Sequence, residues 1–163
     1  MTEVGKSLRR RLAEALPGRL RYAAIALWGY HRRTGGWPNI LHPQDIREKC
    51  QARKIWDHDP RLPRFADKFL VKDYVTSRLG PGWVIPTLWS GTELPPRSQR
   101  DWTPPFVIKV NSGCGWNIFI RDESDLDWPV IEARCRDWMA TSFALDRGEW
   151  HYDRIAPRIL VEP

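Results

Sequence analysis

Residues 104–120 combine two short apolar stretches with a glycine-containing loop between them. The stretch 106–110 is rich in β-branched residues and follows two prolines, and a second apolar stretch covers residues 118–120. Short runs of this kind, bounded by turn-forming residues, predict β-strands, and their spacing predicts a hairpin. Its tip, residues 111–117, contains Gly113 and Gly115. We therefore expect a sheet that includes this hairpin.

The segments on either side of the hairpin predict helices. Apolar residues at four-residue spacing predict a helix over residues 5–33, interrupted at Pro17-Gly18. Two further helices are predicted over residues 45–54 and 68–79, each preceded or begun by an aspartate that can cap it. A fourth begins at Asp127-Trp-Pro, because proline suits the first turn of a helix.

Two more strands complete the predicted order. One covers residues 83–89 and is interrupted by Pro86, and the other covers residues 158–162 after Pro157. Helices, a hairpin, another helix and a last strand together predict an α+β fold. We expect the last strand to leave an exposed sheet edge, to which a partner chain or a second copy could add.

The distribution of charge argues against a nucleic-acid partner. The net charge is +6, but the first 35 residues carry eight lysines or arginines and two glutamates, so they account for the whole excess. The rest of the chain is neutral, unlike a protein built around a phosphate backbone. The basic helical segment, residues 5–33, could instead lie on an anionic membrane face or contact a partner subunit. The ten tryptophans are expected mainly in and around the core.

The cysteines and histidines do not have the spacing of a zinc site. Cys50, Cys114 and Cys135 are odd in number and far apart, which also argues against a disulfide framework. A reducing, cytoplasmic compartment fits this pattern best. The longest apolar run near the N-terminus, residues 22–28, is far shorter than the ~20 residues of a membrane span.

Lys109 is the most unusual residue of the predicted hairpin. It lies inside an otherwise apolar strand, where a lysine must reach solvent or meet an anion. The glycines that follow allow successive amides to form a concave cradle for phosphate oxygens. An ordinary glycine-containing hairpin tip is the alternative interpretation. No GxxxxGK[ST] or GxGxxG pattern is present, so neither a P-loop nor a Rossmann site is indicated.

Four segments, taken in order, resemble one known family. They are residues 54–69, which end in Ala-Asp-Lys-Phe, residues 106–109 (Phe-Val-Ile-Lys), residues 111–117, and residues 149–162, from Glu-Trp-His-Tyr to Pro-Arg-Ile-Leu-Val-Glu. This order is similar to the TupA-like ATP-grasp family of teichuronopeptide and capsular polysaccharide biosynthesis. The resemblance covers about residues 50–163. We therefore expect a basic amphipathic helical segment, residues 1–36, from the charge and periodicity, and, from the resemblance, the N-terminal half of an ATP-grasp-like domain over residues 50–163.

The resemblance implies that Lys68 and Lys109 hold the phosphates of ATP, while the glycine loop closes over them. Glu162 would lie at the hinge where adenine or ribose binds. The implied nucleotide-binding residues are Lys68, Lys109, Asn111, Ser112, Gly113, Cys114, Gly115 and Glu162. Proteins of this family are carboxylate–amine ligases that activate a carboxylate as an acyl phosphate, with ATP and Mg²⁺. Phosphoryl transfer depends mainly on positioning and charge stabilisation, which two lysines and an amide-rich loop supply.

Two departures from the family are visible. The family's loop usually begins Asn-His-Gly-Ser-Gly, whereas here it is Asn-Ser-Gly-Cys-Gly, so the histidine is replaced by Ser112. The sequence also stops at Pro163, before the second subdomain that supplies the adenine floor and the magnesium ligands. We therefore expect a truncated nucleotide site, which is either incomplete or completed by a partner chain. A non-catalytic interaction module, docked through its basic helix on a membrane or a partner, is the alternative function.

Overall fold

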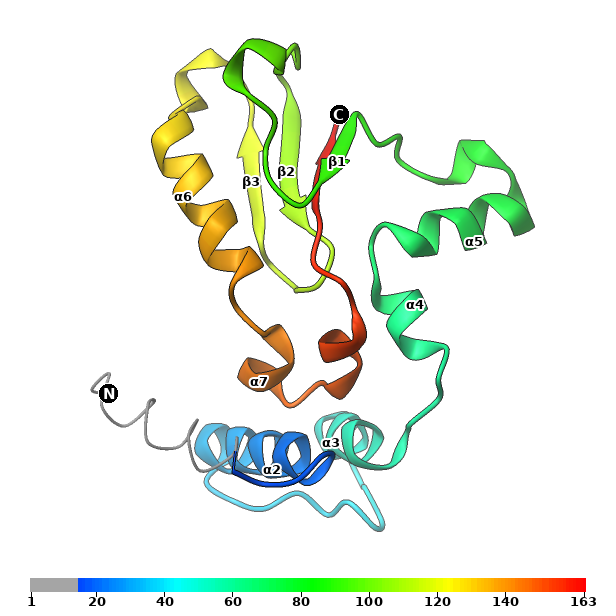
Figure 1. The fold of residues 1–163 in the computed structure, drawn as a ribbon. Coiled ribbons are helices and arrows are strands. Elements are labelled where there is room, and N and C mark those ends of the chain that lie inside the picture. The colour runs from blue at the N-terminus through cyan, green and yellow to red at the C-terminus, as the bar shows by residue number, and fades with distance from the viewer. Residues whose placement is uncertain (1–14) are drawn as a thin grey trace. The chain divides into compact units, whose positions relative to one another are not determined.

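A computed structural model of the chain describes residues 15–163 (Figure 1). Residues 1–14, which belong to the predicted basic segment, lie outside this range. The chain forms two compact units. The helical unit contains the described residues up to Leu62 together with Phe143–Asp153, and the sheet unit contains Pro63–Ser142 and Arg154–Pro163. Among the described residues, no helix is both long enough and apolar enough to cross a membrane.

The helical unit is built around α2, Leu20–Thr34. This helix buries Tyr22, Ala26 and Tyr30 and contacts both α3, Ile46–Trp56, and α7, Phe143–Arg147. Gly35, with φ of 76°, ends it in the left-handed conformation that glycine adopts most easily. The predicted helix over residues 5–33 is therefore confirmed from Leu20 onward, while its first part falls outside the described residues.

The second long helix of this unit begins where its cap predicts. Helix α3 covers Ile46–Trp56, and the Asp45 side chain accepts a hydrogen bond from the Glu48 amide. Near its end, Lys54 forms an ion pair of 2.9 Å with Glu149. The indole of Trp150 donates to the carbonyl of Asp57 at 3.0 Å. These two contacts join α3 to the segment that follows α7 within the same unit.

The sheet unit contains a four-stranded antiparallel sheet in the order β1-β4-β2-β3. Its strands are β1 (Trp89–Gly91), β2 (Phe106–Val110), β3 (Asn117–Ile120) and β4 (Ile159–Glu162). The predicted hairpin is confirmed as β2 and β3. β4 pairs with β1 on one side and β2 on the other, and all four of its residues are buried. The expected free edge at the last strand is therefore wrong.

Helix α6, Trp128–Met139, covers one face of the sheet (Figure 1). The side chain of Asp127 caps it by accepting a hydrogen bond from the Val130 amide, as the sequence predicts. Ile131 and Cys135 face the sheet and complete the core. The strand residues of this core are Phe106, Ile108, Val110, Ile120, Ile159 and Val161. Five tryptophans pack around it: Trp89, Trp102, Trp116, Trp128 and Trp138.

The segment before β1 departs most from expectation. Helix α5 covers Leu70–Leu79 after the short helix α4, Leu62–Ala66. The carboxylate of Asp67 accepts hydrogen bonds from the amides of Phe69 and Leu70, so the predicted cap is confirmed although the helix begins two residues later. The predicted strand over residues 83–89 is wrong except at its last residue. Pro86 has no N–H to donate to a neighbouring strand, and pairing starts only near Trp89.

Candidate functional site

Alternation along β2 and β4 separates two kinds of side chain. Ile108, Val110, Ile159 and Val161 turn toward α6. Residues of the opposite parity, including Lys109 and Glu162, must project from the other side of the sheet. We call this side of the sheet the lysine face. It comprises Lys109, Glu162 and Arg158, together with Lys68 and Lys72, which reach it from the region of α5. All of these residues belong to the sheet unit.

Glu162 lies at the centre of the lysine face. It is only 1% exposed, and such a carboxylate needs positive partners to offset its lost hydration. One of its oxygens lies 2.6 Å from the ammonium of Lys72. The other forms an ion pair with the ammonium of Lys109. Two positive charges thus share one negative charge, and the group keeps a net positive charge.

Lys72 was not among the residues that the sequence motifs indicated. Its ammonium contacts Glu162 and also donates to the carbonyl of Ile85 at 2.8 Å and the hydroxyl of Thr87 at 2.6 Å. Its three donors are therefore occupied by the protein. Lys72 follows Lys68 by four residues, a spacing that places side chains on one face of a helix, and this signal could have identified it.

Lys68 holds the glycine loop. Its ammonium donates to the carbonyls of Val110 at 2.9 Å and Asn111 at 3.4 Å, and also to that of Gly113. Burial lowers the pKa of Lys68, and repulsion from the charge of Lys109 acts in the same direction. The structure therefore places this predicted phosphate ligand against the carbonyls of the loop.

Asn111 fixes the base of the loop to the segment before β4. It is 1% exposed, and its side chain donates to the carbonyl of Ala156 at 3.1 Å. The same side chain accepts from the amide of Arg158 at 2.7 Å. Ser112 and Gly113 are buried behind it, and Gly115 has a φ of 77°. A Cβ atom at Gly113 would lie 2.5 Å from the Trp116 ring, so only glycine fits there without displacing that ring.

The tip of the loop combines two exposed residues with backbone amides that have no acceptor among residues 15–163. Cys114 and Gly115 are exposed. In the part of the chain that the structure describes, no group accepts a hydrogen bond from the backbone N–H groups of residues 112–115. Consecutive unbonded amides beside a lysine can bind an anion. The structure thus brings all eight sequence-predicted residues together around one loop and one strand end.

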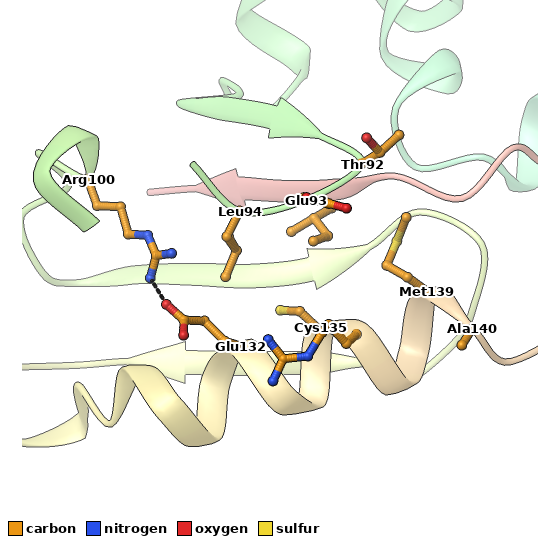
Figure 2. Close-up of a pocket in the computed structure, with 10 residues that line it drawn as sticks. Thr92, Glu93, Leu94, Arg100, Glu132, Cys135, Met139 and Ala140 are labelled. Atoms are coloured by element: carbon orange, nitrogen blue, oxygen red, sulfur yellow. Dashed lines mark ion pairs between the residues drawn. The ribbon is translucent and has the colours of Figure 1, made fainter. Parts of the chain in front are cut away.

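A pocket of about 450 Å³ lies on the opposite, α6 side of the sheet (Figure 2). Leu94, Cys135 and Met139 contribute apolar surface to it. Its buried charged group, Arg100, is paired with Glu132 at 2.7 Å. Burial raises the pKa of Cys135 to about 11, so this thiol stays neutral. None of the sequence-predicted site residues lines this pocket.

Neither a metal-binding group in the described residues nor a comparison with known proteins assigns a further functional residue. Within residues 15–163, no three His, Cys, Asp or Glu side chains are grouped so that they could hold a metal ion. No family model, no curated protein and no solved structure matches the chain at a significant level. The functional argument therefore rests on the sequence motifs and on the geometry of the lysine face.

Proposed function

We propose that the chain binds the polyphosphate of ATP on the lysine face, as the phosphate-holding half of an ATP-grasp-like site over residues 50–163. The observation that carries this proposal is the position of the glycine loop. Its amides, residues 112–115, have no acceptor among the described residues, the loop follows the strand that carries Lys109, and the ammonium of Lys68 donates to the loop's carbonyls. A positive group beside free amides suits an anion with several oxygens.

The three lysines would contribute differently. The ammonium of Lys68 donates to three backbone carbonyls of the protein. That of Lys72 contacts a carbonyl, a hydroxyl and the carboxylate of Glu162. The ammonium of Lys109 has one partner among the described residues, Glu162, and can direct its remaining donors at a phosphate oxygen. Lys109 is therefore the phosphate-contacting lysine of this proposal, and Lys68 shapes the loop that closes over the ligand.

The wider proposal is a ligase-like protein of cell-surface polysaccharide biosynthesis, located in the cytoplasm. Its reaction class would be activation of a carboxylate as an acyl phosphate, which needs Mg²⁺. The described residues do not fit a magnesium site, because Glu162 is occupied by Lys72 and Lys109 and no three His, Cys, Asp or Glu side chains of that part of the chain are grouped so that they could hold a metal ion. No catalytic residue is therefore assigned to this chain.

Titration of Mg-ATP into the purified chain tests the proposal. We expect saturable binding that Lys109→Ala weakens by about 100-fold, because a charge-assisted contact to phosphate is lost. Lys49→Ala is the matched control, since Lys49 is an exposed lysine of the helical unit. Equal affinity of the Lys109→Ala variant and the parent chain would contradict the assignment.

Thiol labelling gives an independent test on the unmodified sequence. Cys114 and Cys50 are exposed, whereas Cys135 is buried. ATP bound under the loop should slow the reaction of Cys114 with maleimide and leave Cys50 unchanged. Peptide mapping by mass spectrometry measures both rates in one sample. Equal protection of Cys50 and Cys114, or protection of neither, would count against binding at the loop.

A second candidate function is docking on an anionic membrane surface through the basic helical segment, residues 5–33. Residues 15–44 contain four arginines and no acidic residue. Leu20 and Trp37 are each 60% exposed, and α2 ends with His31, Arg32 and Arg33. Apolar and aromatic side chains beside arginines favour such interfaces. Binding to phosphatidylglycerol vesicles that persists unchanged in an Arg32→Glu/Arg33→Glu variant would argue against it.

A further inference from the structure

Arg158 is a cation of the lysine face that lies in the last family-like segment, but neither the resemblance nor the ion-pair network around Glu162 gives it a role. It immediately precedes β4 and shares the parity of Leu160 and Glu162. Its backbone is fixed at the base of the loop, because its amide donates to the Asn111 side chain and its carbonyl accepts from the Asn111 amide at 3.0 Å. The position of Arg158 is thus tied to the glycine loop.

The guanidinium of Arg158 is held in place by neighbouring side chains, but no carboxylate of the described residues neutralises its charge. It lies over the ring of Phe69, with 5.0 Å between its central carbon and the ring centroid. One of its nitrogens donates to the hydroxyl of Ser90 at 3.4 Å. Among residues 15–163, no carboxylate forms an ion pair with it. Stacking on an aromatic ring restricts a guanidinium while leaving most of its donors available.

Arg100, on the other side of the sheet, is a stacked arginine with a structural role and can be compared with Arg158. Its guanidinium lies 4.5 Å from the centroid of Trp128, and its side chain is only 5% exposed. Unlike Arg158, it is paired with the carboxylate of Glu132. Stacking therefore accompanies both arginines, and the lack of a carboxylate partner distinguishes Arg158.

The strand register places Arg158 beside Lys109. Lys109 pairs with Leu160, so Arg158 and Glu162 are its two diagonal neighbours on the same face. Such neighbours have Cα atoms about 7–8 Å apart, within reach of long side chains. Glu162 occupies the ammonium of Lys109 from one side. An anion that reaches Lys109 from the other side would meet the guanidinium of Arg158.

We propose that Arg158 is a second anion-binding residue, which contacts the polyphosphate chain of the nucleotide next to the group held by Lys109. A planar guanidinium can bind two phosphate oxygens at once, which an ammonium cannot do with the same geometry. This inference rests on the proposed function for the identity of the ligand. The anion site itself rests on the unpaired charge and the position of Arg158.

The test compares Arg158→Ala and Arg158→Lys with the parent chain, using ATP and inorganic tripolyphosphate as separate ligands in calorimetric titrations. We expect Arg158→Ala to weaken both ligands about tenfold or more, and Arg158→Lys to recover only part of this loss. Arg134→Ala is the matched control, because Arg134 also stacks on a ring, that of Trp138 at 5.3 Å, but belongs to α6. Circular dichroism and thermal unfolding verify that each variant is folded.

Each outcome separates the two proposals. Affinities of Arg158→Ala within about twofold of the parent chain, or an equal loss in Arg134→Ala, would overturn the role of Arg158. Binding of tripolyphosphate that depends on Arg158, without binding of ATP, would support the anion site and refute the nucleotide. If the parent chain binds neither ligand, both proposals are wrong.

Discussion

On each side of the sheet one carboxylate contacts two cations, but the carboxylate on the side that faces α6 is partly hydrated, whereas that of the lysine face is buried. Arg97 and Arg100 both contact Glu132, whose side chain is 21% exposed and therefore partly hydrated. Glu162 is almost fully buried between Lys72 and Lys109. The first arrangement suits packing, since Arg100, stacked on Trp128, covers the rim of an apolar core.

On the lysine face, two further cations, Lys68 and Arg158, form no ion pair with any carboxylate of the described residues. Lys68, Lys72, Lys109 and Arg158 approach one sheet face, where the buried carboxylates are Glu162 and the helix-capping Asp67. A surplus of cations near a buried acid is costly unless a bound anion offsets it. An anion bound on the lysine face, as proposed, would supply this offset, which the partly hydrated group on the α6 side does not need.

Ile108→Ala should show the largest effect on stability, because Ile108 is fully buried on the α6 side. We expect a loss of about 2–5 kcal/mol in the free energy of unfolding, from lost burial and the cavity left behind. Val107→Ala, one residue earlier on the lysine face, is the matched control and should cost clearly less. Urea denaturation measures both, and equal losses would show that the two faces do not differ in packing.

Glu162→Gln should have the next largest effect. Removing the shared charge leaves Lys72 and Lys109 without their partner, at an expected cost of about 1–3 kcal/mol. The same change should strengthen tripolyphosphate binding, because the anion no longer competes with a carboxylate for Lys109. Glu93→Gln, an exposed position at the pocket on the other side, should alter neither property. Weaker tripolyphosphate binding in Glu162→Gln would contradict this account.

Lys72→Met tests the residue that the motifs did not indicate. The substitution keeps the apolar stem and removes the contacts to Glu162, Ile85 and Thr87, so we expect a loss of about 1–2 kcal/mol in stability. Its ATP affinity should fall less than that of Lys109→Ala, since Lys72 acts on the ligand through Glu162. A loss as large as that of Lys109→Ala would instead make Lys72 a direct phosphate ligand.

Glu132→Gln should have the smallest effect, and one that depends on pH. Hydrogen bonds from Arg97 and Arg100 lower the pKa of Glu132 from 4.5 to about 2. A lowered pKa means that the stabilisation is present above about pH 4.5 and is lost as pH falls toward 2. Because the pair is partly hydrated, we expect less than about 1 kcal/mol at neutral pH. Acid titrations of the parent chain and the variant should converge near pH 2; parallel curves would refute the assignment.

Local signals account for the parts of the structure that the sequence predicted. The hairpin of β2 and β3 follows from β-branched residues around a glycine turn, and Asp45 and Asp127 each cap the helix that they precede. The grouping of Lys109 with the loop was predicted because both belong to one hairpin. Lys68 and Glu162 could be added only through the order of the family-like segments, which links residues far apart in the chain.

The missed features depend on long-range pairing. The position of β4 between β1 and β2 cannot be derived from the composition of residues 158–162, which suits an edge or a central strand equally. The proposed role of Arg158 depends on its register opposite Asn111, and register is not visible in a single sequence. The strand over residues 83–89 was predicted from apolar residues, but Pro86 prevents that pairing.

The central position of β4 also fixes an order of events during protein synthesis. The hairpin of β2 and β3 can form as soon as residues 106–120 have left the ribosome. β1 cannot join it, because only β4 pairs with both β1 and β2, and residues 159–162 are made much later. Until then, the hairpin lacks Glu162 beside Lys109. The proposed anion site can therefore assemble only after translation has passed residue 162.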